Sequence, residues 1–291
     1  MQQSIGVISA KIIKDSIHGT RQTRLITLEV EVPRFLLAQI NTHRMIVKNY
    51  QSSRAVPVAK LAEQAPFVPH IVGKNKVGMA AAEYLSSDEL AAFQSDWLKL
   101  RQQAVDGALQ LCEKYNLHKQ LANRLLEPFS MCKGVLTGTL SSWEHVIKLR
   151  KDGAAQPEFQ QLAMLIEDAI ASSTPQQLEL GQWHLPYVDA VEAGDDGVNI
   201  KIAASCIAQV SYRKLDDSPE KALSVFDKLD IFGDKPHISP LQHIACAQDE
   251  SAINDFVFDA YLNNDCKYYA EFGNSFVQAS KYVENDKQLF L

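Results

Sequence analysis

The segment 42–58, THRMIVKNYQSSRAVPV, concentrates side chains that bind anions. It holds two arginines, Arg44 and Arg54, and the hydroxyls of Ser52 and Ser53 directly precede the second. Guanidinium groups and serine hydroxyls suit the oxygens of a phosphate or a carboxylate. Because the segment has no glycine, it is not a glycine-rich phosphate loop. It indicates an anion site, although a solvated polar loop after a helix would have the same composition.

Two further arginines lie beside apolar residues and are therefore candidates for partial burial. Arg124 stands in NRLLEPF, and Arg150 stands in IKLRKDGAAQPE. A buried arginine needs an anionic partner. Glu127 or Glu158 could supply that partner within the chain, and a bound ligand could supply it equally well.

A third candidate is KPHISPLQH together with the residues that follow it. His237, His243 and Cys246 are possible metal ligands, but their spacing matches no common zinc pattern. We predict no metal site here, and a loop that contacts a ligand or caps a helix is the better interpretation. The sequence also lacks the GxGxxG, Walker, HExxH and GxSxG patterns, so a nucleotide cofactor would not bind through a Rossmann fingerprint.

The composition is that of a globular enzyme. Apolar residues make up 46% of the 291 residues and charged residues 22%. The net charge of −6 and the lack of a long basic run argue against a nucleic-acid partner. No apolar run suggests a membrane span or a signal peptide, and we expect a cytoplasmic protein. The five cysteines form no CxxC pair, so we expect buried free thiols and no catalytic cysteine.

Hydrophobic periodicity and turn composition predict strands and helices in the first two thirds of the chain. The predicted strands are 5–14, 24–32 and 130–140, and the first two form a hairpin through a loop at 15–23. The predicted helices are 33–44, 86–115, 141–150 and 157–172, and a loop follows the first of them. Ser86 or Ser87 suits the N-cap of the long helix, Ser141 and Glu144 have capping-box spacing, and Pro157 suits a first turn.

A loop at 181–197 predicts a boundary between two parts of the chain. We expect a core at 1–190 and a C-terminal lobe at 191–291. The lobe is predicted to contain a strand at 200–212, a helix at 218–229 and a closing helix near 255–262. A sheet combined with long helices predicts an α/β or α+β fold.

These motifs together resemble the flavin-dependent thymidylate synthases. That family carries the signature R-H-R-x-x-S-x-N-E-x-S-x-R after an apolar helix that contains a glutamine. Here the helix supplies Gln39, and the signature continues through His43 and Arg44, then Asn49, Ser52 and Arg54.

A second block extends the resemblance. Arg124 resembles the family arginine that binds the phosphate or the base of the substrate. Arg150 resembles the arginine of the segment L-R-x-x-x-x-A-Q-x-E, with Gln156 and Glu158 at the matching positions. The resemblance implies that Arg150 contacts the uracil ring and biases its ionisation.

Two family elements that normally lie near the N-terminus have counterparts near the C-terminus of this chain. CIAQVSYRK resembles the A-R-V-S-Y element and implies that Ser211 lies near the flavin. HISPLQH resembles H-x-[ST]-P-F-E-H and implies the same for His237, Ser239, Gln242 and His243. The order of the halves indicates a permuted or lobe-duplicated variant.

The sequence departs from the family pattern at five positions. Thr42 replaces the first arginine, Val47 the first serine and Tyr50 the glutamate. In the C-terminal element Gln242 replaces a glutamate, and Ala154 lies where the family has a histidine after the second arginine.

The resemblance implies a central, mainly antiparallel sheet flanked by long helices, with a smaller C-terminal lobe, and an enzyme that assembles as a homo-oligomer, most simply a tetramer. It implies the reductive methylation of dUMP to dTMP, in which methylenetetrahydrofolate gives the carbon, NADPH reduces FAD and the flavin delivers hydride. A related flavin- and folate-dependent pyrimidine-nucleotide enzyme and a non-catalytic nucleotide-binding protein are the alternatives.

The resemblance also assigns roles to individual residues. Arg150 would be catalytic. The expected substrate-binding residues are Gln39, Ser52, Ser53, Arg54, Arg124 and Arg150. The expected cofactor-binding residues are His43, Arg44, Asn49, Ser211, His237, Ser239 and Gln242.

Overall fold

The main structural element is a five-stranded sheet. The computed structural model describes residues 4–78, 80–188, 196–211, 218–231, 233–234, 236–249, 272–273 and 275–284. The strands are β1 (Ser9–His18), β2 (Arg24–Pro33), β3 (Val47–Tyr50), β4 (Met131–Thr139) and β5 (Gln176–Leu178), and their order in the sheet is β3-β4-β2-β1-β5. Neighbouring strands are antiparallel except for β1 and β5. The prediction of a mainly antiparallel sheet with helices is confirmed.

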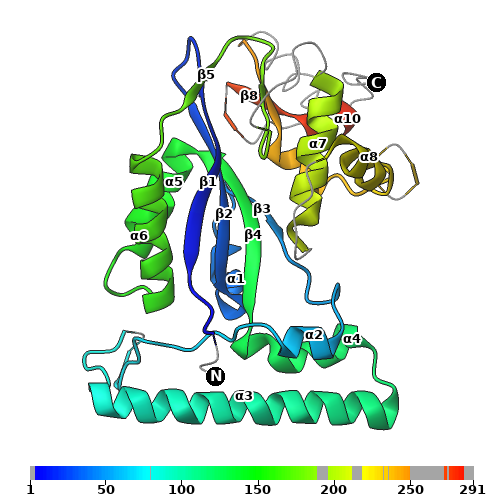
Figure 1. The fold of residues 1–291 in the computed structure, drawn as a ribbon. Coiled ribbons are helices and arrows are strands. Elements are labelled where there is room, and N and C mark those ends of the chain that lie inside the picture. The colour runs from blue at the N-terminus through cyan, green and yellow to red at the C-terminus, as the bar shows by residue number, and fades with distance from the viewer. Residues whose placement is uncertain are drawn as a thin grey trace.

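The two faces of this sheet are covered by different parts of the chain (Figure 1). On one face Ile26, Leu28 and Leu136 pack against helices α5 (Leu140–Arg150) and α6 (Pro157–Ala171). On the other face Leu25 and Val47 pack against residues from the C-terminal third of the chain. Side chains on a strand alternate between its two faces, so successive residues of β2 contact different layers.

The β1–β2 hairpin is confirmed, but β1 is longer than the sequence predicts. Residues 15–18 were expected in the loop because Asp15, Ser16 and His18 have turn composition. They continue the strand because each polar side chain has a partner in the fold. The Asp15 carboxylate pairs with Arg24 and accepts a hydrogen bond from Ser173 at 2.6 Å.

The segment between β2 and β4 differs from its prediction in two ways. The helix expected at 33–44 is shorter and consists of the 3-10 turn η1 (Arg34–Leu36) and α1 (Leu37–Ile40). The loop expected after it contains β3, whose residues pair with 134–137 of β4. Four residues carry too little periodicity to mark a strand, and β4 supplies the missing hydrogen bonds.

A long helix, α3 (Ser87–Tyr115), lies across one end of the sheet (Figure 1). Ser86 caps it as predicted, with a capping box to Glu89, and the helix ends at Asn116, whose φ of 49° is left-handed. The short helices α2 (Val58–Ala62) and α4 (Lys119–Ala122) and the 3-10 segment η2 (Asn123–Phe129) pack beside it.

The two helices on the α5/α6 face are confirmed, with one correction at a cap. Helix α6 begins at Pro157 as predicted. Helix α5 begins one residue early, at Leu140, because the Thr139 hydroxyl accepts a hydrogen bond from the Ser142 amide. The predicted capping box of Ser141 and Glu144 is therefore wrong, since a residue at the end of β4 takes the capping position.

The C-terminal part contains one element of the wrong predicted type. The strand expected at 200–212 is helix α7 (Asp196–Ala208), followed by the 3-10 turn η3 (Gln209–Ser211). All five consecutive residues 203–207 of α7 are buried, and five residues span more than one full helical turn, so the helix is covered on all sides there. A continuous apolar run fits a buried helix as well as a buried strand, so periodicity could not separate the two.

The rest of the C-terminal part consists of short elements. Helix α8 (Pro219–Asp227) confirms the predicted helix, and η4 (Ser239–His243), β7 (Ala245–Ala247), β8 (Phe276–Gln278) and α10 (Ala279–Glu284) follow. Strand β6 (Trp183–His184) pairs with β7 to complete a three-stranded sheet. The closing helix expected near 255–262 lies outside the described residues. The boundary at residue 190 also lies outside them, and the division at that point stays a prediction.

Candidate active site

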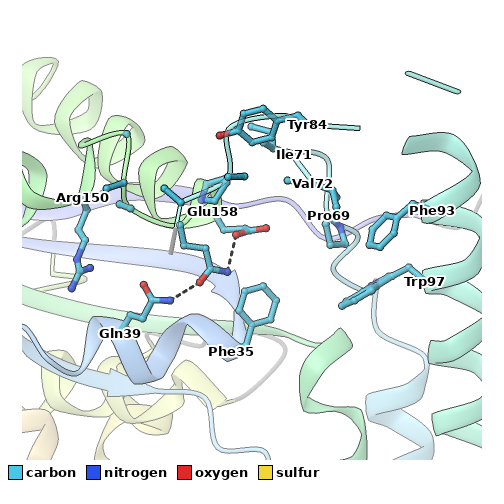
Figure 2. Close-up of a pocket in the computed structure, with 18 residues that line it drawn as sticks. Phe35, Gln39, Pro69, Ile71, Val72, Tyr84, Phe93, Trp97, Arg150 and Glu158 are labelled. Atoms are coloured by element: carbon cyan, nitrogen blue, oxygen red, sulfur yellow. Dashed lines mark hydrogen bonds between the residues drawn. The ribbon is translucent and has the colours of Figure 1, made fainter. Parts of the chain in front are cut away.

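A cavity of about 730 Å³ lies where α1, the first half of α3 and the start of α6 face one another (Figure 2). The segment around residues 69–84 lines another side of it. Two residues of the predicted site, Gln39 and Arg150, line this cavity, and so do Gln156 and Glu158. A concave site of this size with a few polar side chains is typical of a small-molecule pocket.

Arg150 is held by two neighbouring side chains from the turn after α1. Its Nε donates to Nε2 of His43 at 2.8 Å, and its Nη2 donates to the Thr42 hydroxyl at 3.3 Å. The guanidinium carbon lies 4.7 Å from the centre of the Phe159 ring. Within the described residues no carboxylate forms an ion pair with Arg150. Its charge is therefore available to a ligand in the cavity.

His43 is a neutral acceptor for this bond. Burial, together with the charges of Arg150, His145 and Lys48, lowers the pKa of His43 to about 4. A neutral imidazole that accepts at Nε2 carries its proton on Nδ1. His43 is 9% exposed, and its ring packs edge-on against Phe159, with the ring centres 5.7 Å apart. His43 and Phe159 together fix the direction in which the Arg150 guanidinium points.

A chain of three polar side chains forms another part of the cavity wall (Figure 2). Gln39 donates to the amide oxygen of Gln156. The Nε2 group of Gln156 in turn donates to the carboxylate of Glu158 at 2.9 Å. Gln156 is the N-cap residue of α6, and Glu158 lies in the first turn of that helix. The short loop between α5 and α6 therefore places these three hydrogen-bonded side chains next to Arg150.

Aromatic side chains form the wall that faces these polar groups. Phe35, Tyr84, Phe93 and Trp97 line the cavity. Trp97 is anchored by a hydrogen bond from its indole nitrogen to the Phe67 carbonyl at 2.9 Å. The sequence prediction missed this wall, because the aromatic residues come from three separate segments and share no motif.

A second group of predicted residues gathers away from the cavity. The Asn123 side chain donates to the carbonyls of Ser53 and Val56, which fastens the segment after β3 to η2. Arg54 is exposed, and its amide donates to the Ser52 hydroxyl at 3.3 Å. Because Ser53 and Asn123 are bonded, Arg54 and Arg124 come from neighbouring positions on two adjoining segments.

Arg124 has the internal partner that its sequence allowed. Its guanidinium pairs with Glu127 at 2.7 Å, and the Arg124 side chain is 53% exposed. An exposed pair of this kind is worth little and can exchange for a ligand phosphate. The substrate contacts expected of Ser52, Ser53, Arg54 and Arg124 stay predictions.

The cavity is lined, within the described residues, by none of the side chains of Arg44, Asn49, His237, Ser239 and Gln242, which were expected to bind a cofactor. Arg44, His237 and Ser239 are exposed, and Ser211 ends η3. The Asn49 amide donates to the carbonyl of Ile207 at 3.4 Å and thus connects β3 to α7. Gln242 lies in η4, and its carbonyl accepts a hydrogen bond from Gln278. Their cofactor roles stay predictions.

Tyr50 occupies the place of the family glutamate with a half-buried ring and a buried hydroxyl. The ring packs over Gly134, where a Cβ atom would lie 2.5 Å from Tyr50 Cδ1. Burial raises the pKa of the Tyr50 hydroxyl, which has no hydrogen-bond partner in the described part of the chain. A neutral side chain therefore stands where the family pattern has a carboxylate.

A buried polar network that the sequence analysis missed joins the main sheet to the C-terminal part. Thr27 binds Thr137 at 2.7 Å and His184 Nε2 at 2.8 Å, and Thr137 binds His243 Nδ1 at 2.8 Å. His184 Nδ1 also binds the Ser16 hydroxyl. Burial lowers the pKa of His184 and of His243 to about 3.

Two kinds of feature are absent from the described residues. These residues contain no group of three His, Cys, Asp or Glu side chains arranged to hold a metal ion. Among them there is also no helix with the length and apolar character that crossing a membrane requires.

The antiparallel sheet and its covering helices are the fold of a known class of protein. A family model described as thymidylate synthase complementing protein matches residues 3–176. The chain therefore belongs to this family, which confirms the resemblance stated from its motifs.

The chain is also similar to solved structures of that fold. The structure of the UMP/dUMP methylase PolB from Streptomyces cacaoi with 5-Br UMP matches with a TM-score of 0.50 and 16% identity, over 58% of this chain and 92% of PolB. Thymidylate synthase X from Helicobacter pylori, solved with FAD and dUMP, matches with a TM-score of 0.36 and 19% identity, over 50% of this chain and 67% of that chain. A search of curated proteins finds no match.

Proposed function

We propose that this protein is a flavin-dependent enzyme that methylates dUMP to dTMP, with methylenetetrahydrofolate and NADPH as co-substrates. The observation that carries the proposal is the state of Arg150. Its guanidinium lies in a cavity wall, is oriented by neutral His43 and has no carboxylate partner among the described residues. A fixed cation in a partly dry site stabilises negative charge that develops on a ligand.

The proposed role of Arg150 is to hold the uracil ring and stabilise its growing negative charge. An arginine keeps its proton at neutral pH, so this role is electrostatic and differs from proton donation. Gln39 lies beside it with its amide nitrogen already bonded to Gln156, which leaves the amide oxygen for a ligand donor. These side chains would orient the ring, which is the main task of a protein whose cofactor carries the redox chemistry.

The phosphate of the nucleotide is assigned to the segment after β3 and to η2. Arg54 is exposed, and no side-chain hydrogen bond or ion pair occupies its guanidinium in the described structure. Ser52, Ser53 and Arg124 adjoin it through the Asn123 contact. We expect Arg54→Ala to weaken dUMP binding by about 1.5–3 kcal/mol, the value of one charge-assisted contact, while the protein stays folded. Unchanged dUMP affinity by calorimetry would contradict this assignment.

The residues present also suit a flavin dinucleotide. Its pyrophosphate needs cations and hydroxyls, and the exposed Arg44 guanidinium has no partner within the residues described. Arg44, His237, Ser239 and Gln242 would hold this group, with Ser211 near it. When bound there, a flavin would supply the hydride for the reduction.

The test is a product assay with a colour control. Purified protein should be yellow with flavin absorbance, and should form dTMP from dUMP, methylenetetrahydrofolate and NADPH. Flavin-loaded protein that forms no dTMP under these conditions would overturn the proposal. A colourless protein that binds dUMP would favour a nucleotide-binding role without catalysis. The replacement of the family glutamate by Tyr50 is consistent with that role.

A second candidate is methylation of a different pyrimidine nucleotide. The fold that this chain shares with PolB is found in a protein named as a UMP/dUMP methylase. Turnover of UMP compared with dUMP, and rescue of a thymidine-requiring bacterium, separate the two candidates.

We also propose that the protein acts in the cytoplasm as a homo-oligomer, most simply a tetramer. The family resemblance implies active sites built between subunits, which fits the separation of the Arg150 cavity from the segment of Arg54. Light scattering on active, flavin-loaded protein tests the oligomeric state, and an active monomer would refute it.

A further inference from the structure

Glu158 is a buried carboxylate with one oxygen left for a ligand. Its side chain is 7% exposed and lines the cavity. One oxygen accepts from Gln156 at 2.9 Å, and the other has no hydrogen-bond partner in the described residues. The nearby guanidinium of Arg150 is turned to His43 and Thr42.

The position of Glu158 explains how its charge is tolerated. It lies in the first turn of α6, where the helix dipole favours a negative group. That effect stabilises the charge but fills none of the hydrogen-bonding capacity of the second oxygen. A carboxylate facing a cavity in this way attracts N–H donors and repels carbonyl oxygens.

The hydrogen-bond chain from Gln39 fixes the direction of this acceptor. Because Gln39 donates to the Gln156 oxygen, the Gln156 amide must present its NH₂ group to Glu158. The carboxylate is thus held in one orientation. Figure 2 shows Glu158 on the polar side of the cavity, with Phe93 and Trp97 on the opposite side.

The opposite wall suits a flat ring. Phe35, Phe93 and Trp97 are half-buried and line the cavity, and the rings of Phe93 and Trp97 are 5.8 Å apart at an angle of 34°. Aromatic side chains stack on heteroaromatic ligands, while a buried polar group opposite selects the edge of the ring.

We propose that the Glu158 end of the cavity binds the pterin ring of a folate. The free carboxylate oxygen accepts one N–H group of its aminopyrimidinone edge, and the oxygen bonded to Gln156 accepts the adjacent N–H group with its second lone pair. A uracil ring has one N–H between two carbonyl oxygens, so it suits the Arg150 end and is repelled by Glu158. The cationic Arg150 end therefore selects the uracil ring, and the anionic Glu158 end selects the pterin ring. The choice of a folate as the source of the donor-bearing ring rests on the proposed function.

The first experiment compares two ligands that differ at this edge. Pterin carries an amino group where lumazine carries a carbonyl, and both are planar and similar in size. Binding is followed by quenching of tryptophan fluorescence, because Trp97 lines the cavity whereas Trp143 and Trp183 are buried elsewhere. We expect pterin to bind at least about tenfold more tightly than lumazine, as one charge-assisted hydrogen bond requires. Trp97→Phe should remove the signal. Equal affinities would overturn the inference.

The second experiment removes the carboxylate. Glu158→Gln should weaken pterin binding by about tenfold or more and remove the preference over lumazine, while dUMP affinity stays within a few-fold. Glu144→Gln, on the exposed side of α5, is the matched control and should change neither. Unchanged pterin affinity in folded Glu158→Gln protein would refute the proposal.

The two experiments are independent of turnover. If Glu158→Gln fails to fold, the pterin and lumazine comparison on the unaltered protein still decides. Pterin selectivity without dTMP formation would leave this site in place while the proposed function fails. Formation of dTMP without pterin selectivity would support the proposed function and refute the pterin site at Glu158.

Discussion

The Nε group of Arg150 donates to Nε2 of His43 at 2.8 Å, and this bond connects the end of α5 to the turn after α1. Only a neutral histidine can accept such a bond, and burial and nearby cations keep His43 neutral by lowering its pKa to about 4. The orientation of the guanidinium therefore depends on a residue that the sequence suggested for a different role.

Arg150→Lys should affect chemistry more than binding. A lysine has no planar fork with which to reach His43 and Thr42 while facing the cavity. We expect a folded, flavin-loaded protein that binds dUMP within a few-fold and loses turnover by about 10²–10³, as for a lost oxyanion donor. Single-turnover flavin oxidation and thermal melting measure the two effects. A mild loss that follows the change in stability would show that Arg150 is only structural.

Substitutions of His43 separate its positioning role from the predicted cofactor contact. His43→Gln keeps a hydrogen-bond acceptor for Arg150 Nε, whereas His43→Ala leaves Nε without one, at a cost of about 1–3 kcal/mol. We expect His43→Ala to lower kcat strongly and His43→Gln to recover much of it, with little change in flavin affinity. If both variants lose flavin equally and keep kcat when saturated, His43 binds the cofactor instead.

The buried histidines should make the free energy of unfolding decrease as the pH falls below 6.5. The folded pKa of His43 is about 4 and those of His184 and His243 about 3, all below the ordinary value of 6.5. Between these limits the unfolded chain binds more protons than the folded one. The stabilisation is complete above pH 6.5 and is lost as the pH falls toward 4 and then 3.

Urea unfolding measured from pH 7 down to pH 4 tests this expectation. The free energy of unfolding should fall across this range, and His43→Gln should make the slope smaller. A slope that stays the same in His43→Gln would show that His43 keeps its ordinary pKa in the folded protein.

The Thr137 hydroxyl should contribute to stability through the buried network. Thr137→Val preserves the shape of the side chain but removes the partner of His243 Nδ1 and one of the two partners of Thr27. Each buried group left without a partner costs about 1–3 kcal/mol. Thr174→Val makes the same change at an exposed position and serves as the control. A loss no larger than that of the control, by chemical denaturation, would show that the network is not stabilising.

No single cysteine should be needed for turnover. Burial raises the pKa of the Cys132 and Cys246 thiols to about 11, so neither is a thiolate at neutral pH. Cys206 is buried in α7. Replacing each of the five cysteines with alanine should leave activity largely intact. A folded, flavin-bound variant without activity would identify a catalytic thiol.

The sequence by itself determined the elements whose signals are local. The alternation in β2, the capping box at Ser86 and Pro157 at the start of α6 each act within a few residues. The motifs likewise identified the family and drew attention to Gln39 and Arg150, which line one cavity. Spacing along a chain is enough for these features, because propensity, capping and periodicity depend on near neighbours.

Only the tertiary structure decided the features that join distant segments. Strand β3 exists because β4 lies beside it, and α7 is a helix although its apolar run also fits a strand. The bond between His43 and Arg150, the aromatic wall with Trp97 and the Thr27–Thr137 network bring together residues far apart in sequence. Such contacts depend on how faces pack, and no local pattern records which side chain will meet which partner.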